Sequence, residues 1–302
     1  MNSESRLREK IKYMESVPSI NRKLDRIISG DKNSVDNIRS YYKKNRAAYK
    51  RFHSDEGFMH FRVSKNGKLS DDDIYYQPNV ISEHIKSGAN VVELGSGMGA
   101  NLLYLAKKHP DASFTGVDLC PAPIKDMPSN VRIIEHDYGD MPMIADDSVD
   151  VVYAVETIVH CSDKEKVFGE VRRILKPDGV LIVYDYALQR VFDELDETQK
   201  KAVALISKGA AAALIESAAE WERHFEASGL IKSVVNDLSK DTMPDLKRLA
   251  SMAERVLERR ISAWFFCTFF PLNFVGNIIV GYLGYDSFRE GLIYNMEWIY
   301  RK

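Results

Sequence analysis

The sequence has few cysteines, little net charge and no apolar run behind its polar first residues. It has three cysteines in 302 residues, Cys120, Cys161 and Cys267, an odd number at wide spacings. This argues against a disulfide framework and a metal site of closely spaced ligands, and suits a reducing cytoplasm. A net charge of −2 gives no electrostatic basis for binding nucleic acid. Residues 1–6 are polar with no apolar run behind them, so we predict a cytoplasmic chain without a signal peptide.

Residues 91–99, VVELGSGMG, are the stretch around which the sequence is organised. Apolar residues run up to Glu93, glycines follow at alternate positions (Gly95, Gly97 and Gly99), and a helical pattern begins after them. Glycine permits a positive φ and lets the backbone approach a ligand closely. A helix N-terminus favours polar or anionic groups. The stretch predicts a buried strand, a tight turn and a helix at a ligand site.

A second strand with an acid at its end supports a nucleoside site. Sites of this kind place an acid about 20 residues after the glycine turn, at the end of the next strand. Residues 113–118 form that strand and Asp118 is that acid. We expect Asp118 to hold ribose hydroxyls.

Strands and helices alternate through the middle of the chain, which predicts a parallel α/β sheet with helices on both faces and ligands at the strand carboxyl ends. Residues 121–129 are proline-rich, so any helix there must be short. Before this region, residues 5–50 have helical spacing with a break at 29–31. The expected strands are 90–94, 113–118, 131–135, 149–155, 180–186, 231–238 and an edge strand at 292–300, and the expected helices are 80–85, 99–108, 163–175, 188–208 and 210–228.

Residues 261–285 contain no charge and are long enough to cross a bilayer. Pro271, Asn273 and Asn277 interrupt them, and the strand that follows must return to the sheet that precedes them, which a single span prevents. We predict a hydrophobic cap over a pocket. An ordinary buried helix pair is an alternative. A weak membrane contact is another, because an apolar face exposed here would form a large patch.

These patterns divide the chain into four parts. We expect a helical N-terminal arm and lid at 1–78, a nucleoside-binding core at 79–240, a hydrophobic cap insertion at 241–288 and the last strand of the core at 289–302.

The glycine spacing resembles motif I of class I S-adenosylmethionine (SAM) methyltransferases. Dinucleotide sites use G-x-G-x-x-G, whereas this chain has E-x-G-x-G-x-G from Glu93 to Gly99. Residues 149–156 resemble motif IV, and residues 171–180 resemble the helix, turn and fifth strand of the same family. The resemblance covers about residues 89–187. It implies a Rossmann-like seven-stranded methyltransferase sheet with an antiparallel last strand, and SAM as the cofactor.

The same resemblance implies a set of cofactor-binding residues. Asp137, after the third strand, matches the family position of an acid that meets the adenine amino group, and its neighbour Tyr138 would line the ring. Glu93, at a strand end, suits a cationic ligand. The complete implied set is Glu93, Gly95, Ser96, Gly97, Gly99, Asp118, Leu119, Asp137, Tyr138 and Val155.

The residues at the end of the predicted fourth strand indicate which group of methyltransferases the chain resembles. Nucleic-acid amino-methyltransferases often carry Asn/Asp-Pro-Pro-aromatic there, but this chain has residues 154–160, AVETIVH. The tract Glu156-Thr157-x-x-His160 resembles the sterol C-methyltransferase group, and prenyl-diphosphate C-methyltransferases have a comparable glutamate. Residues 41–42 and 57–61 are similar to that group's tyrosine-rich arm and glycine-aromatic-histidine segment. The chain departs from the group at 121–129 and 241–288.

This resemblance implies methylation of carbon in an isoprenoid or sterol-like lipid. An alkene would attack the sulfonium methyl group and leave a carbocation, which carboxylates and aromatic faces stabilise. Glu156 is the expected cation stabiliser or base, and His160 its partner or an alternative base. The expected substrate-binding residues are Tyr41, Tyr42, His60, Tyr186 and Trp264.

Other interpretations stay open. An O- or N-methyltransferase of a small polar metabolite needs only proximity of the nucleophile to the methyl group, with His160 as a base. A prenyl diphosphate substrate would need Mg²⁺ and converging cations such as Lys43, Lys44 and Arg46. A non-catalytic SAM-binding protein is a further alternative, and homo-oligomerisation is left open. The His and Cys residues lack the spacing of metal ligands.

Overall fold

The N-terminal part of the chain forms three helices. The structure is a computed structural model that describes residues 5–30 and 35–302, so the predicted polar start at 1–4 and the predicted break at Asp31 lie outside the described residues. The helices are α1 (Arg6–Ser16), α2 (Pro18–Ile28) and α3 (Val35–Phe52). Pro18 occupies the first turn of α2, where its missing N–H costs no hydrogen bond.

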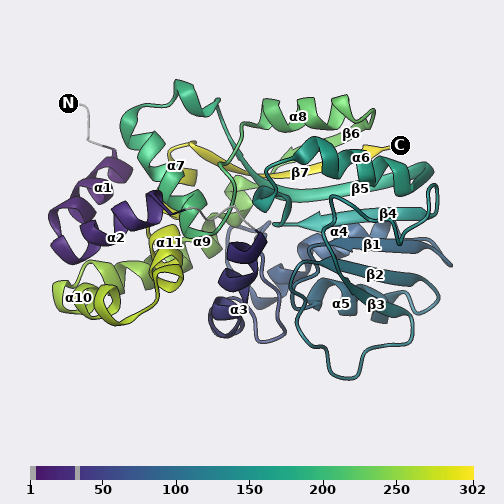
Figure 1. Cartoon of the computed structure of the whole chain (residues 1–302), viewed down its shortest axis with the longest axis horizontal. Helices are drawn as coiled ribbons and strands as arrows, with labels where there is room; N and C mark the ends of the chain where they lie inside the picture. Colours follow the sequence, from purple (N-terminus) through teal and green to yellow (C-terminus); the bar gives the residue numbers. More distant parts are fainter. Residues whose placement is uncertain (1–4, 31–34) are drawn as a thin grey trace.

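A seven-stranded sheet forms the centre of the molecule (Figure 1). Its order is β3-β2-β1-β4-β5-β7-β6, and β7 alone runs antiparallel to its neighbours. The predicted Rossmann-like sheet with an antiparallel last strand is therefore confirmed. The strands are β1 (Asn90–Leu94), β2 (Ser113–Asp118), β3 (Val131–Glu135), β4 (Val149–Val155), β5 (Leu175–Leu188), β6 (Ile231–Asp237) and β7 (Ile293–Arg301).

The prediction that the last strand lies at the edge of the sheet is wrong. β7 is inserted between β5 and β6, and it is buried over most of its length, whereas β6 is largely exposed. Glu297 in β7 tolerates this position because it accepts hydrogen bonds from Tyr184 Oη at 2.6 Å and Asn236 Nδ2 at 2.5 Å. A buried carboxylate is stable when such partners replace water.

Helices cover both faces of the sheet. α6 (Lys164–Ile174) and α8 (Ala218–Ala227) pack on one face, and α4 (Tyr76–Glu83) and α5 (Ala100–Lys108) on the other. Successive strand residues point to opposite faces. Val92 of β1 therefore belongs to the core under α6 and α8, and its neighbour Val91 to the core under α4 and α5.

Two predicted helices differ in the structure. No helix forms in 119–130, because Pro121, Pro123 and Pro128 lack the N–H groups that a helix needs. The predicted alanine-rich helix at 210–228 begins only at Ala218, with Ser217 as its N-cap. Ala211 before it has a φ of +55°, which a helix cannot accommodate.

The strand β5 extends two residues beyond its predicted end, to Leu188. The predicted helix at 188–208 consequently begins only at Glu197, as α7 (Glu197–Gly209). Asp196 caps it by accepting a hydrogen bond from Gln199 N.

Beyond the carboxyl ends of the strands lies a separate group of helices (Figure 1). α7, α9 (Ser239–Leu257), α10 (Arg260–Phe269) and α11 (Leu272–Arg289) share one apolar core with α1 and α2. Lys10 of α1 is buried in it, with its Nζ 2.7 Å from Asp286 Oδ2 and 2.8 Å from Tyr282 O. α7 and α11 touch closely, because a Cβ on Gly209 would lie 2.9 Å from Gly276 O.

The charge-free stretch 261–285 is divided between two helices. α10 ends at Phe269, and α11 begins at Leu272 after Pro271. Within residues 5–30 and 35–302, no helix combines the length and apolar character needed to cross a bilayer. The prediction that this stretch does not form a span agrees with that finding.

Candidate active site

The turn between β1 and α5 is held in a conformation that requires glycine. Gly95, Gly97 and Gly99 have φ values of +68°, +51° and +78°. A Cβ on Gly95 would lie 2.0 Å from Thr157 Oγ1, and a Cβ on Gly99 would lie 2.4 Å from Ile124 Cδ1. Side chains at these positions would be strained and would collide with their neighbours. The turn therefore keeps bare backbone at the carboxyl end of β1.

Asp118, at the end of β2, is fixed against this turn. Its Oδ2 accepts a hydrogen bond from Gly97 N at 2.8 Å, and its Oδ1 accepts one from Cys120 N at 2.6 Å. Backbone donors hold the carboxylate in one orientation beside the glycines. Its expected role toward ribose hydroxyls stays a prediction.

A cavity of about 540 Å³ opens from this turn toward the helical group. Ligand sites usually have volumes of about 300–1,000 Å³ and are mostly apolar. The strand ends form its floor, and α3, α9 and α11 supply most of its apolar walls. The cavity is thus formed jointly by α3, the carboxyl ends of the strands and the helices before β7.

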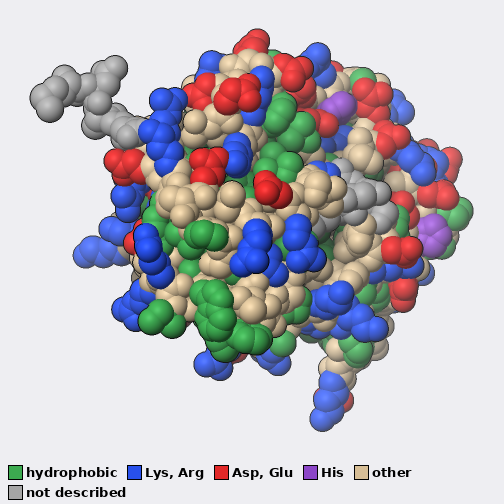
Figure 2. Space-filling model, turned by 60° about the vertical axis from the view of Figure 1, so that its left-hand side comes forward, with side chains coloured by type: hydrophobic (Ala, Val, Ile, Leu, Met, Phe, Trp, Pro, Cys, Tyr) green, Lys and Arg blue, Asp and Glu red, His purple; other side chains and the backbone are tan. Residues whose placement is uncertain are grey.

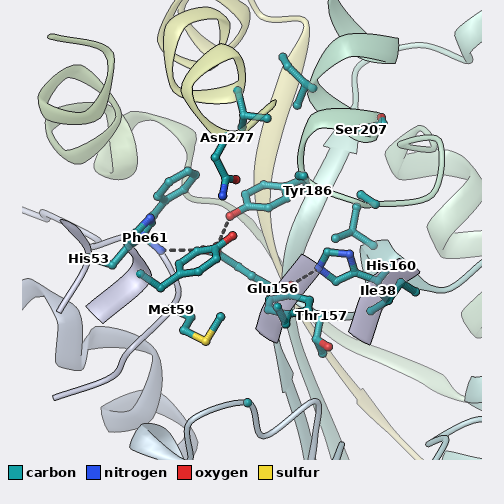
Figure 3. A pocket seen from close by; sticks show the side chains of 18 of the residues that line it. Ile38, His53, Met59, Phe61, Glu156, Thr157, His160, Tyr186, Ser207 and Asn277 are labelled. Atoms are coloured by element: carbon teal, nitrogen blue, oxygen red, sulfur yellow. Dashed lines mark hydrogen bonds between the residues drawn. The ribbon is translucent and has the colours of Figure 1, made fainter. Parts of the chain in front are cut away.

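Glu156 projects into this cavity directly after β4. Its Oε1 accepts a hydrogen bond from Phe61 N at 2.9 Å, and its Oε2 accepts one from Tyr186 Oη (Figure 3). Its φ is +51°, a left-handed conformation that costs about 1–2 kcal/mol in a residue other than glycine. Burial raises the pKa of Glu156 to about 8. Strain and a shifted pKa in one cavity residue are typical of a functional group.

His160 also lines the cavity, to the right of Glu156 in Figure 3, and lies in a short 3₁₀ helix, η2 (Ile158–His160). Its Nδ1 is 3.0 Å from Ala211 O. A carbonyl only accepts, so Nδ1 carries the proton and Nε2 accepts from Tyr42 Oη. Burial lowers the pKa of His160, which keeps the ring neutral. The hydrogen bond ties α3 to the end of β4.

Two arginines of α3 hold the segment that follows β2. Arg39 Nε donates to Leu119 O at 2.9 Å, and an Arg46 terminal nitrogen donates to Cys120 O at 3.0 Å. Arg46 also lines the cavity. α3 therefore closes the cavity over the residues next to Asp118.

Comparison with known proteins identifies the core. Residues 92–183 match the family described as "Methyltransferase domain". These residues form a methyltransferase domain. The chain is 29% identical over 126 residues to a sterol 24-C-methyltransferase of Gibberella zeae, which covers 39% of this chain and 33% of that protein. The matched region thus spans about a third of that relative's length.

Solved structures share the fold of the methyltransferase domain and of the helices around it. A geranyl diphosphate methyltransferase in complex with geranyl diphosphate (GPP) and sinefungin has a TM-score of 0.67 at 17% identity, covering 88% of this chain and 98% of that one. The cyclopropane synthase MmaA2 of Mycobacterium tuberculosis has a TM-score of 0.71 at 14% identity, covering 89% and 98%. The family match confirms the resemblance of this region to methyltransferases, and the solved structures share the predicted fold. SAM is the cofactor that this resemblance predicts.

The predicted cofactor residues of the methyltransferase domain fall into two groups. The first group lines the cavity: Gly95, Gly97, Asp118, Leu119, Asp137, Tyr138 and Val155. The second group, Glu93, Ser96 and Gly99, does not line it. Glu93 is 3% exposed, its Oε1 lies 3.4 Å from Asn101 Nδ2, and burial raises its pKa to about 8. In this structure Glu93 lies behind the turn, at a distance from the cavity surface.

The cavity fits SAM as a cation with an adenosine group. Bare glycine backbone offers close approach at Gly95 and Gly97, and Asp118 is held beside them. Asp137 and Glu156 also face the cavity, so its carboxylates favour a positive sulfonium. The structure therefore supplies the groups that the predicted cofactor requires.

The predicted substrate-binding residues do not all line the cavity. Tyr42 and Tyr186 line it. Tyr41 is 1% exposed behind the wall, where its hydroxyl group bonds with Tyr49 and Asn277. His60 is buried against Asn101, with Nε2 3.1 Å from Oδ1.

The fifth predicted substrate residue, Trp264, lies on α10, is 51% exposed and does not line the cavity. The stretch that contains it is the predicted cap over the pocket. Its neighbour Phe266 and Phe274 of α11 do line the cavity. The α10–α11 pair thus contributes to the cavity wall through Phe266 and Phe274 in place of the predicted Trp264.

Several cavity residues were missed from the sequence. Phe61 supplies the backbone donor to Glu156, and the glycine-aromatic-histidine segment was the available signal for it. His53 lines the cavity with a buried Nδ1 that has no hydrogen-bond partner among the described residues, and burial lowers its pKa to about 4. Asn277, in the predicted cap, and Ser207 on α7 also line it, and neither was among the predicted site residues.

Proposed function

We propose that this chain transfers a methyl group from SAM to a carbon atom of a small nonpolar alkene of the isoprenoid or sterol type. The observation that carries the proposal is Glu156, an enclosed carboxylate in a mostly apolar cavity that opens onto the glycine turn. A fixed carboxylate there is suited to a reaction that forms a cation.

When bound, SAM supplies an electrophilic methyl group on a sulfonium. The alkene π-electrons form the new C–C bond, the S–CH₃ bond breaks with its electron pair remaining on sulfur, and a carbocation is left. Glu156 stabilises this charge and accepts the proton whose loss restores a double bond. The rings of Tyr186 and Phe61, with centroids 5.7 Å apart, provide aromatic faces at the same place.

The charge of the cavity favours a substrate without a diphosphate. Arg46 is the only lysine or arginine among the described residues that line it, and it already donates to Cys120 O. Lys43 and Lys44, which could have joined it, are exposed on α3 and do not line the cavity. Several converging cations would be needed to hold a diphosphate in a dry site.

The hydrogen bonds of His160 favour methylation of a carbon atom over methylation of an oxygen or nitrogen nucleophile that must first lose a proton. A base for such a nucleophile needs a free lone pair, but His160 Nε2 already accepts from Tyr42 Oη. The relatives also support carbon as the methylated atom, since one is a sterol 24-C-methyltransferase and another a geranyl diphosphate methyltransferase.

We also propose the division of the chain into an arm and lid at 1–78, a core at 79–240, a cap at 241–288 and a final strand at 289–302. α3 of the arm and α11 of the cap each supply cavity residues, such as Tyr42 and Asn277. The two parts would therefore close over the substrate together.

The test is methyl transfer from labelled SAM to two substrate pools, a nonpolar lipid extract and a polar metabolite fraction, each with Mg²⁺ or with a chelator. Label in the lipid pool that survives mild hydrolysis and is unaffected by the chelator supports the proposal. Label only in the polar pool indicates an O- or N-methyltransferase. Transfer that requires Mg²⁺ indicates a prenyl diphosphate substrate.

A further inference from the structure

The outer surface of α10 is apolar and exposed. Ile261, Trp264, Phe265 and Phe269 are 85%, 51%, 46% and 63% exposed. Their spacing places them on one side of the helix, and this set is called the α10 face. Figure 2 shows a group of hydrophobic side chains low on this side of the molecule, with Lys and Arg side chains around it. An exposed cluster of large apolar side chains generally marks an interaction site.

The charges near the α10 face are mainly positive. Arg259 and Arg260 are exposed where α10 begins, and residues 261–285 contain no acid. α2 packs against α10 and carries three cations and one acid in residues 22–26. Glu258, the nearest acid in the sequence, is engaged by Tyr282 Oη at 3.2 Å. The apolar face therefore has a cationic border.

A series of aromatic rings connects the α10 face to the cavity. The ring of Phe265 lies 5.7 Å from that of Phe266, which lies 4.6 Å from Phe270. Phe270 is 5.0 Å from Phe274. Phe266 and Phe274 line the cavity described above. The α10 face and the cavity are thus two sides of the same pair of helices.

We infer that the α10 face docks on the surface of an anionic lipid bilayer and that the nonpolar substrate moves between bilayer and cavity beside Phe266 and Phe274. The movement of substrate rests on the proposed function, whereas the docking does not. Helices bind at bilayer interfaces when aromatic and aliphatic residues enter the headgroup region and cations meet anionic lipids. Such docking would deliver a water-insoluble substrate without exposing it to solvent.

A second copy of the chain fits this face less well. In a two-fold dimer the α10 face meets its own equivalent, which brings the cationic borders of both copies into one interface and adds no acid from residues 261–285 to pair with them. Like charges brought together at an interface oppose association. An anionic lipid surface instead complements the same border.

The docking test uses the full chain without SAM, mixed with vesicles of phosphatidylcholine alone or with added phosphatidylglycerol. Of the three tryptophans, all in the described part of the chain, Trp221 and Trp298 are fully buried, so Trp264 reports on the face. We expect co-sedimentation with the anionic vesicles and a shift of tryptophan emission to shorter wavelength. Salt should weaken both effects.

Variants separate the two contributions to docking. Phe265→Glu with Phe269→Glu should lower vesicle binding at least tenfold. Arg259→Gln and Arg260→Gln should each lower it roughly fivefold, the equivalent of about 1 kcal/mol per cation. Ile231→Glu is the control, because Ile231 is 66% exposed on the distant strand β6, and it should bind as the unmodified chain does.

Absence of binding to both vesicle types would overturn the docking. Self-association that shields Trp264 without vesicles would assign the face to a second copy. The delivery half is tested by comparing methyl transfer to substrate in vesicles and in detergent. The Phe265→Glu, Phe269→Glu variant should lose only the vesicle reaction, and equal rates would reject delivery. No transfer in either medium would contradict the proposed function and leave the docking result unaffected.

Discussion

The carboxylate of Glu156 accepts a hydrogen bond from the backbone N–H of Phe61 at 2.9 Å, although the two residues are 95 positions apart. Phe61 belongs to the segment between α3 and α4, and Glu156 to the end of β4. The segment before the sheet therefore orients the carboxylate on which the proposed chemistry depends. A backbone donor fixes one carboxylate oxygen without neutralising the charge, which leaves the group able to face a cation.

The first prediction concerns the carboxylate itself. Glu156→Gln keeps the size of the side chain but removes its charge and basicity. We expect SAM binding by calorimetry to persist and turnover to fall at least a hundredfold, the usual range for loss of a general base. Glu83→Gln, at an exposed position in α4, is the matched control and should be unaffected. Turnover of Glu156→Gln near that of the unmodified chain would show that the role assigned to Glu156 is wrong.

The second prediction is the pH dependence of the reaction. Burial raises the pKa of Glu156 to about 8, so the carboxyl group is mostly protonated at lower pH. A base must be ionised, and kcat/KM should therefore rise as pH increases through about 8. Bound SAM favours the carboxylate, so kcat alone should rise at a lower pH.

Other groups titrate in the same range and need a control. Burial also raises the pKa of Asp185 to about 7 and that of Glu93 to about 8. The rise in kcat/KM should be absent from the residual activity of Glu156→Gln. A profile of the same shape in this variant would assign the titration to another residue.

The third prediction separates steric fit from backbone strain at the glycine turn. Gly95 and Gly67 have the same φ of +68°, but a Cβ on Gly95 would lie 2.0 Å from Thr157 Oγ1, whereas one on Gly67 meets nothing within 4 Å. Gly67→Ala should cost about 1 kcal/mol of unfolding free energy, from backbone strain alone.

Gly95→Ala should lose considerably more unfolding free energy than that and should abolish detectable SAM binding. Chemical denaturation and calorimetry on both variants provide the comparison. Equal destabilisation with SAM binding retained would contradict the close contact between the turn and Thr157.

The fourth prediction concerns the link between α3 and the core. Tyr42→Phe leaves His160 Nε2 buried without its donor, which should cost about 1–3 kcal/mol of unfolding free energy. We also expect weaker SAM binding, because α3 holds the backbone carbonyls of Leu119 and Cys120. Tyr104→Phe, whose hydroxyl group contacts Asn79 on the outer side, serves as control and should leave SAM affinity unchanged.

A double-mutant cycle with His160→Ala tests the same contact. If the two residues are coupled as the structure shows, the second change should add little to the first. Fully additive losses in thermal unfolding would mean that Tyr42 and His160 act separately.

The strands β1 to β4 could be predicted to the residue, because their sequence signals are local. Apolar runs ending at glycine or an acid define them, and each is covered by a helix with its own apolar spacing. The predicted elements are wrong where the local sequence pattern and the tertiary packing favour different structures. Alanines at 210–213 favour a helix, but Ala210 and Ala211 form the turn that ends α7, and Ala213 N donates to Val159 O at 3.0 Å. The strand after the cap is last in sequence but interior in the sheet.

The sequence motifs predicted the glycine turn, Asp118, Glu156 and His160, because such groups recur at fixed offsets from strand ends. They could not select Asn277 and Ser207, which line the cavity because α11 and α7 fold over it, or His53, which directly follows α3. Nor could they show that Trp264 faces away from the cavity while Phe266, two residues later, faces into it. The two residues are about half a helical turn apart, and which of them faces the cavity depends on how α10 packs against α2 and α11.

The sequence by itself therefore determined the class of fold and the position of the glycine turn, since both depend on short contiguous patterns whose geometry is set by backbone sterics. Only the tertiary structure decided which side chains enclose the substrate space, how Glu156 is oriented and charged, and which face of α10 is left uncovered. These properties arise from contacts between residues tens to hundreds of positions apart, and burial at those contacts sets the pKa values and exposed surface on which function depends.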